Sequence, residues 1–324
     1  MRVAFLDPLE ARLAEFPKTY LGEHEVLLTT EAGRLPDGVE SADAVVWWDY
    51  PVDAALIESL SSLRFMQRIG MTRFKGDASA ALAKGIPVSA FPLGVPDRVA
   101  FHAFALTAAV LRKLLAGHRA VVDGTNPDGL PEVETGAGAQ VNWARVPDVD
   151  TLNDKTVGIA GFGEIGSCYA RMLRPFNCRV LYHKRNRLTP AQEAYFGVEY
   201  ASLDDLLSKS DVLTSFVPYT EESRKMLGRR EFDLMKPSAI FINCGRGNTV
   251  DEQVLIDVLT TKRIAGAGLD VFAIEPVPQD NPLLTLDNVI LTPHSAGGTP
   301  GWVSSFERIA EQLRRIEVGE PIML

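Results

Sequence analysis

Short apolar runs alternate with segments of helical periodicity along nearly the whole chain, and this alternation limits the fold more than any other feature. The runs 3–6, 65–68 and 156–160 have the length of strands, and stretches such as 52–60 and 78–84 between runs have helical spacing. This order is typical of β-α-β units around a parallel sheet that is covered by helices. The sequence therefore predicts an α/β fold.

Two domains are expected from the length and from one irregular stretch. The 324 residues are enough for two domains of roughly 150 residues each. Residues 123–150 are rich in glycine and proline and lack periodicity, which indicates a long connection. The part before it looks flavodoxin-like, with strands expected at 3–6, 44–48, 65–68 and 87–89. The part after it has the strands of a complete Rossmann-type, doubly wound parallel sheet, which are expected at 156–160, 179–183, 212–216, 239–243, 265–269 and 289–291.

The last helix, expected at 302–318, has no strands of its own to cover and should return to the first domain. The predicted division is therefore a substrate domain of residues 1–97 with 295–324, and a dinucleotide-binding domain of residues 98–294. Because the chain would cross twice between the domains, the crossings should form a hinge. The active site is expected in the cleft between the two domains.

Charge and cysteine usage narrow the class of protein. There are 33 Lys and Arg against 42 Asp and Glu, a net charge of −9, which disfavours binding to nucleic acid or to an anionic membrane. Cys168, Cys178 and Cys244 are odd in number and lack C-x-x-C spacing, so neither a disulfide framework nor a zinc site is expected. No other cluster has the spacing of metal ligands. Since the amino terminus does not read as a signal peptide, a cytoplasmic protein is expected.

A glycine-rich loop follows the expected strand 156–160 directly and opens a helix. In such a loop the first glycine allows a tight turn, the second lets a pyrophosphate approach the backbone, and the third lets the helix pack on the strand. The alternative is that the glycines serve packing only. The strand-loop-helix context favours a dinucleotide site, whose residues are Gly161, Phe162, Gly163, Glu164, Ile165 and Gly166.

Basic residues stand where the next strand should end with an acid. An acid at this place would hydrogen-bond the ribose 2′-hydroxyl of NAD(H), whereas Lys or Arg would pair with the 2′-phosphate of NADP(H). The residues present are His183, Lys184 and Arg185. The sequence therefore predicts a preference for NADP(H), with NAD(H) possible. The alternative is an ordinary solvated basic loop.

Three polar residues follow strands at one edge of the second sheet, where doubly wound folds bind their ligands. They are Arg246, Glu275 and His294. Arg can hold a substrate carboxylate bidentately, and a carboxylate beside an imidazole fixes its tautomer and favours the proton-donating form. Taken singly, Arg246 could form a surface salt bridge and His294 could be structural.

Several linked segments resemble the D-isomer-specific 2-hydroxyacid dehydrogenase family over nearly the whole chain. Besides the glycine loop, the segments are Ser202 to Leu207 with Ser210-Asp211, Val217-Pro218, Leu234 to Pro237 before the Arg246 loop, Asp270 to Pro276, and Thr292 to His294. The chain departs from the family pattern at Lys184, in the substrate loop after Gly70, and at Phe101, where many members carry Glu.

The resemblance implies roles for these residues. Arg246 would orient a 2-oxo acid, His294 would exchange the proton, and Glu275 would support His294. It also implies contacts to the cofactor and to the substrate carboxylate, which would come from Val217, Pro218, Cys244, Gly245 and Asp270 for the cofactor and from Gly70 and Met71 for the substrate.

The resemblance also implies a homodimer. A long helix, expected at 97–117, is apolar on more than one side and needs a second cover, which a partner subunit would supply. Burial between the two domains is the alternative.

The leading hypothesis is an NADP(H)-dependent reductase of a small 2-oxo acid similar to glyoxylate or hydroxypyruvate. One alternative keeps the fold and site but uses a bulkier or phosphorylated acid, or another hydride donor, as in the formate and phosphite dehydrogenases that resemble this family. Another is a nucleotide-sensing protein of the corepressor type. The presence of Arg246, Glu275 and His294 together favours catalysis.

Overall fold

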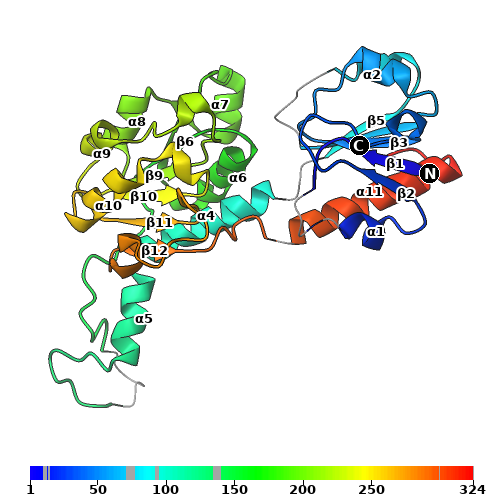
Figure 1. The fold of residues 1–324 in the computed structure, drawn as a ribbon. Coiled ribbons are helices and arrows are strands. Elements are labelled where there is room, and N and C mark those ends of the chain that lie inside the picture. The colour runs from blue at the N-terminus through cyan, green and yellow to red at the C-terminus, as the bar shows by residue number, and fades with distance from the viewer. Residues whose placement is uncertain are drawn as a thin grey trace. The chain divides into compact units, whose positions relative to one another are not determined.

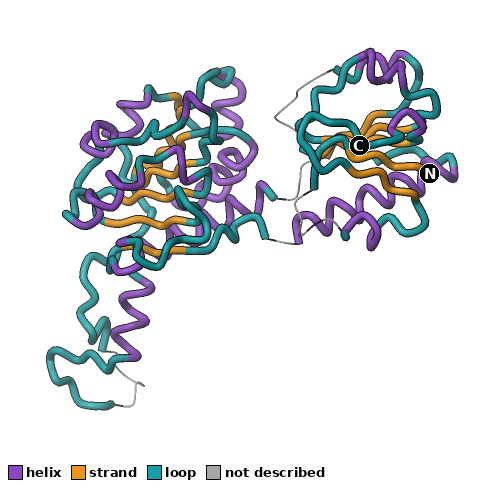
Figure 2. The backbone as a smooth tube through the Cα atoms, viewed as in Figure 1, coloured by secondary structure: helices purple, strands orange, loops and turns teal. Residues whose placement is uncertain are grey.

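The computed structural model describes residues 1–9, 13, 15–70, 77–91, 95–133, 140–298 and 300–323. The chain forms two compact units (Figure 1), which are Met1–Arg98 with Gly297–Leu324, and Val99–Ala296. In each unit the described strands form one parallel sheet that lies between helices (Figure 2). The α/β fold predicted from the alternating pattern is therefore confirmed.

The first unit has a five-stranded sheet in the order β2-β1-β3-β4-β5, which is the flavodoxin-like order. The flavodoxin-like prediction is thus correct, although the edge strand β2 was not among the expected strands. The strands are β1 (Arg2–Phe5), β2 (Glu25–Leu28), β3 (Ala44–Trp47), β4 (Phe65–Ile69) and β5 (Val88–Phe91).

Alternating residues of β1 supply both cores of this unit. Val3 and Phe5 face a cluster that includes Phe306 and Ile309 of α11 (Pro300–Val318). Figure 1 shows α11 and α1 (Phe16–Tyr20) on this face of the sheet. On the other face lie α2 (Ala54–Ser59) and α3 (Ser79–Ala83), whose cluster buries Ala4, Leu6 and Trp47.

The second unit has a seven-stranded sheet in the order β12-β11-β10-β9-β6-β7-β8. Counted from β6, this is the Rossmann order with one added strand. All expected strands are present, and the two-residue edge strand β8 is additional. The strands are β6 (Thr156–Ala160), β7 (Arg179–His183), β8 (Glu199–Tyr200), β9 (Val212–Ser215), β10 (Ile240–Asn243), β11 (Gly266–Leu269) and β12 (Val289–Leu291).

Helices and short 3-10 turns connect these strands. Gly158 and Gly268 allow close packing on the sheet, since a Cβ there would lie 2.1 Å from Ser210 Oγ and 3.0 Å from Leu106 Cβ, respectively. The helices are α4 (Pro96–Leu111), α5 (Leu114–Val122), α6 (Glu164–Leu173), α7 (Pro190–Phe196), α8 (Leu203–Lys209), α9 (Arg229–Leu234) and α10 (Glu252–Thr260), and the turns are η3 (Arg174–Phe176), η4 (Glu221–Ser223), η5 (Gly247–Thr249) and η6 (Pro282–Thr285).

The expectation of a single helix over 97–117 is wrong. The segment breaks at Arg112-Lys113, where Lys113 has a φ of 52°, and α5 leaves α4 at an angle of 57°. The break coincides with a backbone hydrogen bond of 2.9 Å from Asp150 N to Leu111 O, which caps the end of α4. Among the described helices, no single one is long and apolar enough to cross a membrane. Only α4 and α5 taken together have that length and composition, and they form a bent pair.

Candidate active site

Three adjacent strands of the second unit carry the candidate catalytic residues at the same edge. The sheet order places β10, β11 and β12 next to one another, and all three run parallel. Arg246 follows β10, Glu275 follows β11 and His294 follows β12. The chain thus brings residues from separate loops to the edge where doubly wound sheets bind ligands.

His294 and Glu275 form a short hydrogen-bonded pair. The distance from His294 Nδ1 to Glu275 Oε2 is 2.6 Å. The other carboxylate oxygen, Oε1, accepts a hydrogen bond of 3.0 Å from the backbone N–H of Phe272, so the loop itself fixes the orientation of the carboxylate. Because Nδ1 donates to Glu275, His294 Nε2 is the ring atom left to exchange a proton with a ligand. The two side chains are 45% and 35% exposed, so a ligand can reach them.

The backbone of His294 is held in an unusual conformation. Its φ is 51°, in the left-handed region that only a few per cent of residues other than glycine adopt, histidine more often than most. Its N–H donates to the carbonyl of Asp270 at 2.8 Å and to that of Thr292 at 3.0 Å. A conformation of this kind persists where the surroundings determine it, as they do here.

The carboxylate of Asp270 fastens the same loop. Its Oδ1 accepts hydrogen bonds from Thr292 Oγ1 at 2.6 Å and from Ser295 N at 2.9 Å, and its Oδ2 accepts one from Ala296 N at 3.0 Å. Burial opposes ionisation of this group, yet these bonds and one from His102 hold the pKa of Asp270 below its usual value. A buried, ionised Asp270 therefore fixes the loop that presents His294.

His102 of α4 completes this network. Its Nε2 lies 2.9 Å from Thr292 Oγ1 and 3.3 Å from Asp270 Oδ1. Since the Thr292 hydroxyl donates to Asp270, it accepts from His102 Nε2. No sequence signal points to this contact of His102, because Thr292 is 190 residues away.

The Arg246 loop packs directly on the Glu275 loop. A Cβ on Gly247 would lie 1.9 Å from the carbonyl oxygen of Phe272, so only glycine permits this approach. The exposed Arg246 side chain bonds through Nη1 to its neighbouring carbonyl, Gly245 O, at 2.7 Å. The Arg246 guanidinium therefore lies at the exposed edge of the sheet, on a loop whose backbone is held in place by the packing of Gly247.

The glycine loop has the geometry that a dinucleotide requires. Gly161 has a φ of 86°, and a Cβ on it would lie 2.8 Å from the backbone of Phe216. Gly163 is the N-cap residue of α6 and has open space around the position of a Cβ, which leaves its backbone accessible to a phosphate. Gly166 packs closely on Ile159 of β6. Together with the N-terminus of the ten-residue helix α6, these features fit a pyrophosphate.

Two further loops at the same edge of the sheet, which contain Val217-Pro218 and Cys244-Gly245, lie beside the glycine loop. Gly245 packs on the backbone of Val217, to which a Cβ would lie at 2.7 Å. Burial, and then the charge of Asp270, raise the pKa of the Cys244 thiol far above its usual value, so this thiol stays neutral. Pro218 accepts a 2.8 Å hydrogen bond from Ser223 Oγ through its carbonyl.

The basic residues after β7 divide into two groups. Arg187 is engaged with the carboxylate of Glu193, at 2.8 and 3.0 Å. The half-buried Lys184 and the exposed Arg185 have no ion pair with any described residue. His183 Nδ1 lies 2.9 Å from the carbonyl oxygen of Ala201. Lys184 is thus a cation available to an anionic ligand at this end of the sheet, and Arg185 is a second one, whose charge, after a hydrogen bond from Thr220, also helps to lower the pKa of the Glu222 carboxyl.

The remaining predicted site residues lie in the first unit. Gly70 follows β4 and has a φ of 94°, and Met71 lies outside the described residues. Within the described ranges, no group of three or more His, Cys, Asp or Glu residues has the arrangement of a metal site.

The sequence of the second unit matches a known family. A sequence model described as D-isomer specific 2-hydroxyacid dehydrogenase, NAD binding domain, covers residues 104–296. The chain belongs to this family. The predicted resemblance is thereby confirmed, and the chain is a 2-hydroxyacid dehydrogenase with a domain that binds a nicotinamide dinucleotide.

Relatives agree with this assignment. The chain is 35% identical to a glyoxylate reductase of Korarchaeum cryptofilum over 83% of this chain and 78% of the relative. It is 31% identical to a D-3-phosphoglycerate dehydrogenase of Archaeoglobus fulgidus, over 92% of this chain and 54% of that protein. Among solved structures, the NADPH-dependent glyoxylate/hydroxypyruvate reductase of Sinorhizobium meliloti is 26% identical with a TM-score of 0.63, over 99% of this chain and 96% of that one.

Proposed function

We propose that this dehydrogenase reduces a small 2-oxo acid of the glyoxylate or hydroxypyruvate class with NADPH. The observation that carries the proposal is the 2.6 Å pair of His294 and Glu275 at the same sheet edge as Arg246. The names of the glyoxylate reductase and glyoxylate/hydroxypyruvate reductase relatives support the substrate class.

Each residue of the site has a chemical task in this proposal. Arg246 pairs with the carboxylate of the acid and orients its carbonyl. His294 donates a proton from Nε2 to the carbonyl oxygen, while Glu275 accepts the hydrogen bond from Nδ1 and so keeps the ring oriented. The nicotinamide cofactor, when bound, supplies the hydride that reduces C2.

The cofactor would extend along the edge of the second unit. We assign its pyrophosphate to the loop Gly161–Gly166 and its nicotinamide end to the loops of Val217-Pro218, Cys244-Gly245 and Asp270. His183, Lys184 and Arg185 would surround the adenosine ribose.

A substrate panel tests the reaction. Glyoxylate, hydroxypyruvate and a longer 2-oxo acid are assayed with NADPH and with NADH, and a phosphorylated 2-hydroxy acid is assayed with NADP+ and with NAD+, by the change in nicotinamide absorbance. Turnover of one of the two small acids supports the proposal. Turnover of only the phosphorylated acid would replace it by a reaction like that of the phosphoglycerate dehydrogenase relative, and cofactor binding without any turnover would indicate a sensing protein.

Cofactor choice is tested separately through Lys184. We expect kcat/KM to be higher with NADPH than with NADH, because the cations of Lys184 and Arg185 favour a 2′-phosphate. Lys184→Asp should lower the NADPH-to-NADH ratio by about tenfold or more, since an acid repels that phosphate. Lys209→Asp is the control, as this lysine pairs locally with Asp205 at 2.7 Å. A wild-type preference for NADH would contradict the proposal.

We also propose that the protein works in a reducing cytoplasm, which three free cysteines support.

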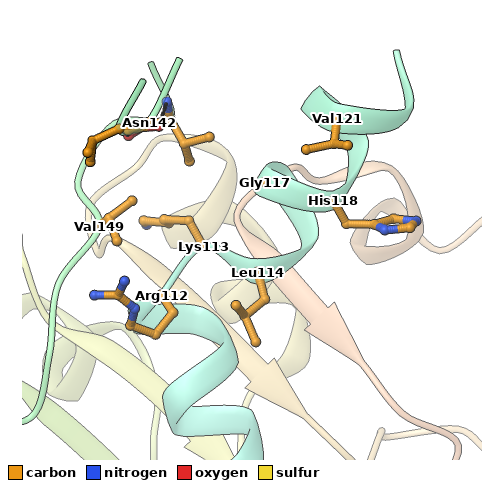
Figure 3. Close-up of a pocket in the computed structure, with 10 residues that line it drawn as sticks. Arg112, Lys113, Leu114, Gly117, His118, Val121, Asn142 and Val149 are labelled. Carbon is orange, nitrogen blue, oxygen red and sulfur yellow. Dashed lines mark hydrogen bonds between the residues drawn. The ribbon is translucent and has the colours of Figure 1, made fainter. Parts of the chain in front are cut away.

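We further propose that the chain forms a homodimer. None of the residues of α5 is buried, and Val121, Val122 and Val141 are 57%, 69% and 86% exposed. A hollow of about 690 Å³ lies between α5 and the following loop. Figure 3 shows residues that line it, among them Lys113 and Val121 on the helix side and Val149 in the loop. A second copy of this chain would cover these apolar side chains.

A further inference from the structure

The Glu275 loop is attached to the rest of the unit by the side chain of Glu252. This residue begins α10, and its Oε2 accepts a hydrogen bond of 2.8 Å from the backbone N–H of Ala273. Its Oε1 accepts one of 3.1 Å from Asn281 Nδ2. Ala273 precedes Glu275 and Asn281 follows it, so one carboxylate fastens both ends of the loop.

The orientation of the Asn281 amide is fixed independently. Its Oδ1 accepts a hydrogen bond of 3.0 Å from the backbone N–H of Leu283 at the start of η6. The Nδ2 group must therefore face Glu252. Each oxygen of Glu252 thus has its own donor, and both bonds are made to a carboxylate, which strengthens a hydrogen bond.

Glu252 also belongs to the segment that carries Arg246. Residues 246–252 run from the guanidinium through η5 to the first turn of α10. Gly247 of this segment lies against the backbone of Phe272, and the carboxylate of Glu252 accepts a hydrogen bond from the N–H of the next residue, Ala273. The Arg246 segment is therefore joined to the Glu275 loop by the backbone packing of Gly247 and by the hydrogen bonds of the Glu252 side chain, which can be altered by substitution.

We propose that Glu252 is a positioning residue of the active site, which holds Glu275 at hydrogen-bond distance from His294 and in register with Arg246. Glu252 contacts neither His294 nor the reacting atoms. The proposal rests on the proposed function for its kinetic consequence, but its structural consequence, the state of the His294 ring, is independent of any substrate.

The two partners allow a complementary exchange. In Glu252→Gln the side chain keeps one acceptor and gains a donor, so it cannot satisfy both Ala273 N–H and Asn281 Nδ2. In Asn281→Asp the cap on Leu283 remains, but a second carboxylate faces Glu252. The double variant Glu252→Gln/Asn281→Asp restores one donor and one acceptor between the two positions, while the amide oxygen introduced at position 252 still accepts from Ala273.

The first measurement is the ¹⁵N spectrum of the histidine rings in the protein without substrate. In the wild type, neutral His294 should carry its proton on Nδ1, because Nδ1 donates to Glu275. Either single variant should shift the ring toward the Nε2–H tautomer, and the double variant should return it toward Nδ1–H. Glu231→Gln is the matched control, since Glu231 also accepts a hydrogen bond from a backbone N–H, that of Gly228, and its other hydrogen bond comes from Arg230 and not from the Glu275 loop.

The second measurement is the kinetics of 2-oxo acid reduction. We expect each single variant to lower kcat by about tenfold, as small misplacements of catalytic groups do, with the KM for the cofactor unchanged and kcat recovered in the double variant. Wild-type tautomer and kcat in both single variants would overturn the proposal, as would a folded double variant with no recovery. If Glu252→Gln fails to fold, Asn281→Asp and the double variant decide. Failure of the wild type to reduce any acid would contradict the proposed function alone.

Discussion

At the scale of single residues, the Asp270 carboxylate joins parts of the chain that are far apart in sequence. The carboxylate accepts hydrogen bonds from Thr292, Ser295 and Ala296 and contacts His102 of α4. The backbone carbonyl of Asp270 accepts a hydrogen bond from the N–H of His294. The candidate proton donor is therefore presented by a loop that a buried charge keeps in place.

This arrangement predicts an acid-sensitive contribution to stability. The pKa of Asp270 lies below its usual value in the fold, so the folded state binds this proton less readily than the unfolded chain. The contribution is present above the unfolded pKa of about 3.9 and is lost as pH falls through the lower folded pKa. Asp270→Asn should lower the free energy of unfolding by about 2–3 kcal/mol at pH 7.

Urea unfolding at pH 7, 5, 3.5 and about 2.5 measures this effect. The difference in the free energy of unfolding between wild type and Asp270→Asn should be the same at pH 7 and 5 and should narrow below about pH 3.9. The exposed Asp257→Asn serves as the control for a carboxylate at the surface. A difference that stays constant across these pH values would show that the charge of Asp270 is not what holds the loop.

The sequence identified the candidate residues that follow strands but missed their supports. Arg246, Glu275 and His294 could be found because strand ends of a parallel sheet share one edge. His102 and Glu252 could not, because each stands in a helix and contacts a loop that only the folded chain brings near. Periodicity locates elements but carries no information on such contacts.

At the scale of elements, two glycines of the glycine loop have different roles: Gly161 allows close packing, and Gly163 leaves space for a ligand. Gly161→Ala would force a Cβ to 2.8 Å from the backbone of Phe216 at a φ of 86°, so it should destabilise the unit by about 1–3 kcal/mol. Gly163→Ala meets no atom within 4 Å and should leave the melting temperature nearly unchanged. It should still weaken NADPH binding, because its methyl group occupies space that we assign to the pyrophosphate.

Thermal unfolding and NADPH titration of both variants check this difference. Equal loss of stability in the two variants would contradict the assigned packing of Gly161. Unaltered NADPH binding by Gly163→Ala would contradict the placement of the pyrophosphate.

The order of elements was predictable, whereas the edges and one break were not. The central strands are continuous apolar runs because they are buried on both faces. The edge strands β2 and β8 are short and partly exposed, so they lack such a run. The break after α4 depends on Lys113 in the left-handed region and on the contact of Leu111 with Asp150, neither of which has a sequence signature.

At the scale of the whole molecule, the exposed apolar side chains of α5 and its loop should decide the oligomeric state. Val122→Asp places a charge on a surface that a second copy is proposed to cover, and should convert the dimer to a monomer. The control is Leu82→Asp, because Leu82 is similarly exposed, at 61% against 69%, but lies in the first unit. Light scattering after size exclusion measures the mass. A wild type with the mass of one chain would contradict the dimer.

The central claim is that His294 supplies the proton in the reduction of a 2-oxo acid. The most direct measurement is kcat of glyoxylate or hydroxypyruvate reduction by His294→Asn, together with its affinity for NADPH; asparagine is chosen because it tolerates a φ of 51°. We predict that kcat falls by about 100-fold or more, with NADPH binding retained. Turnover equal to that of the wild type would contradict the claim.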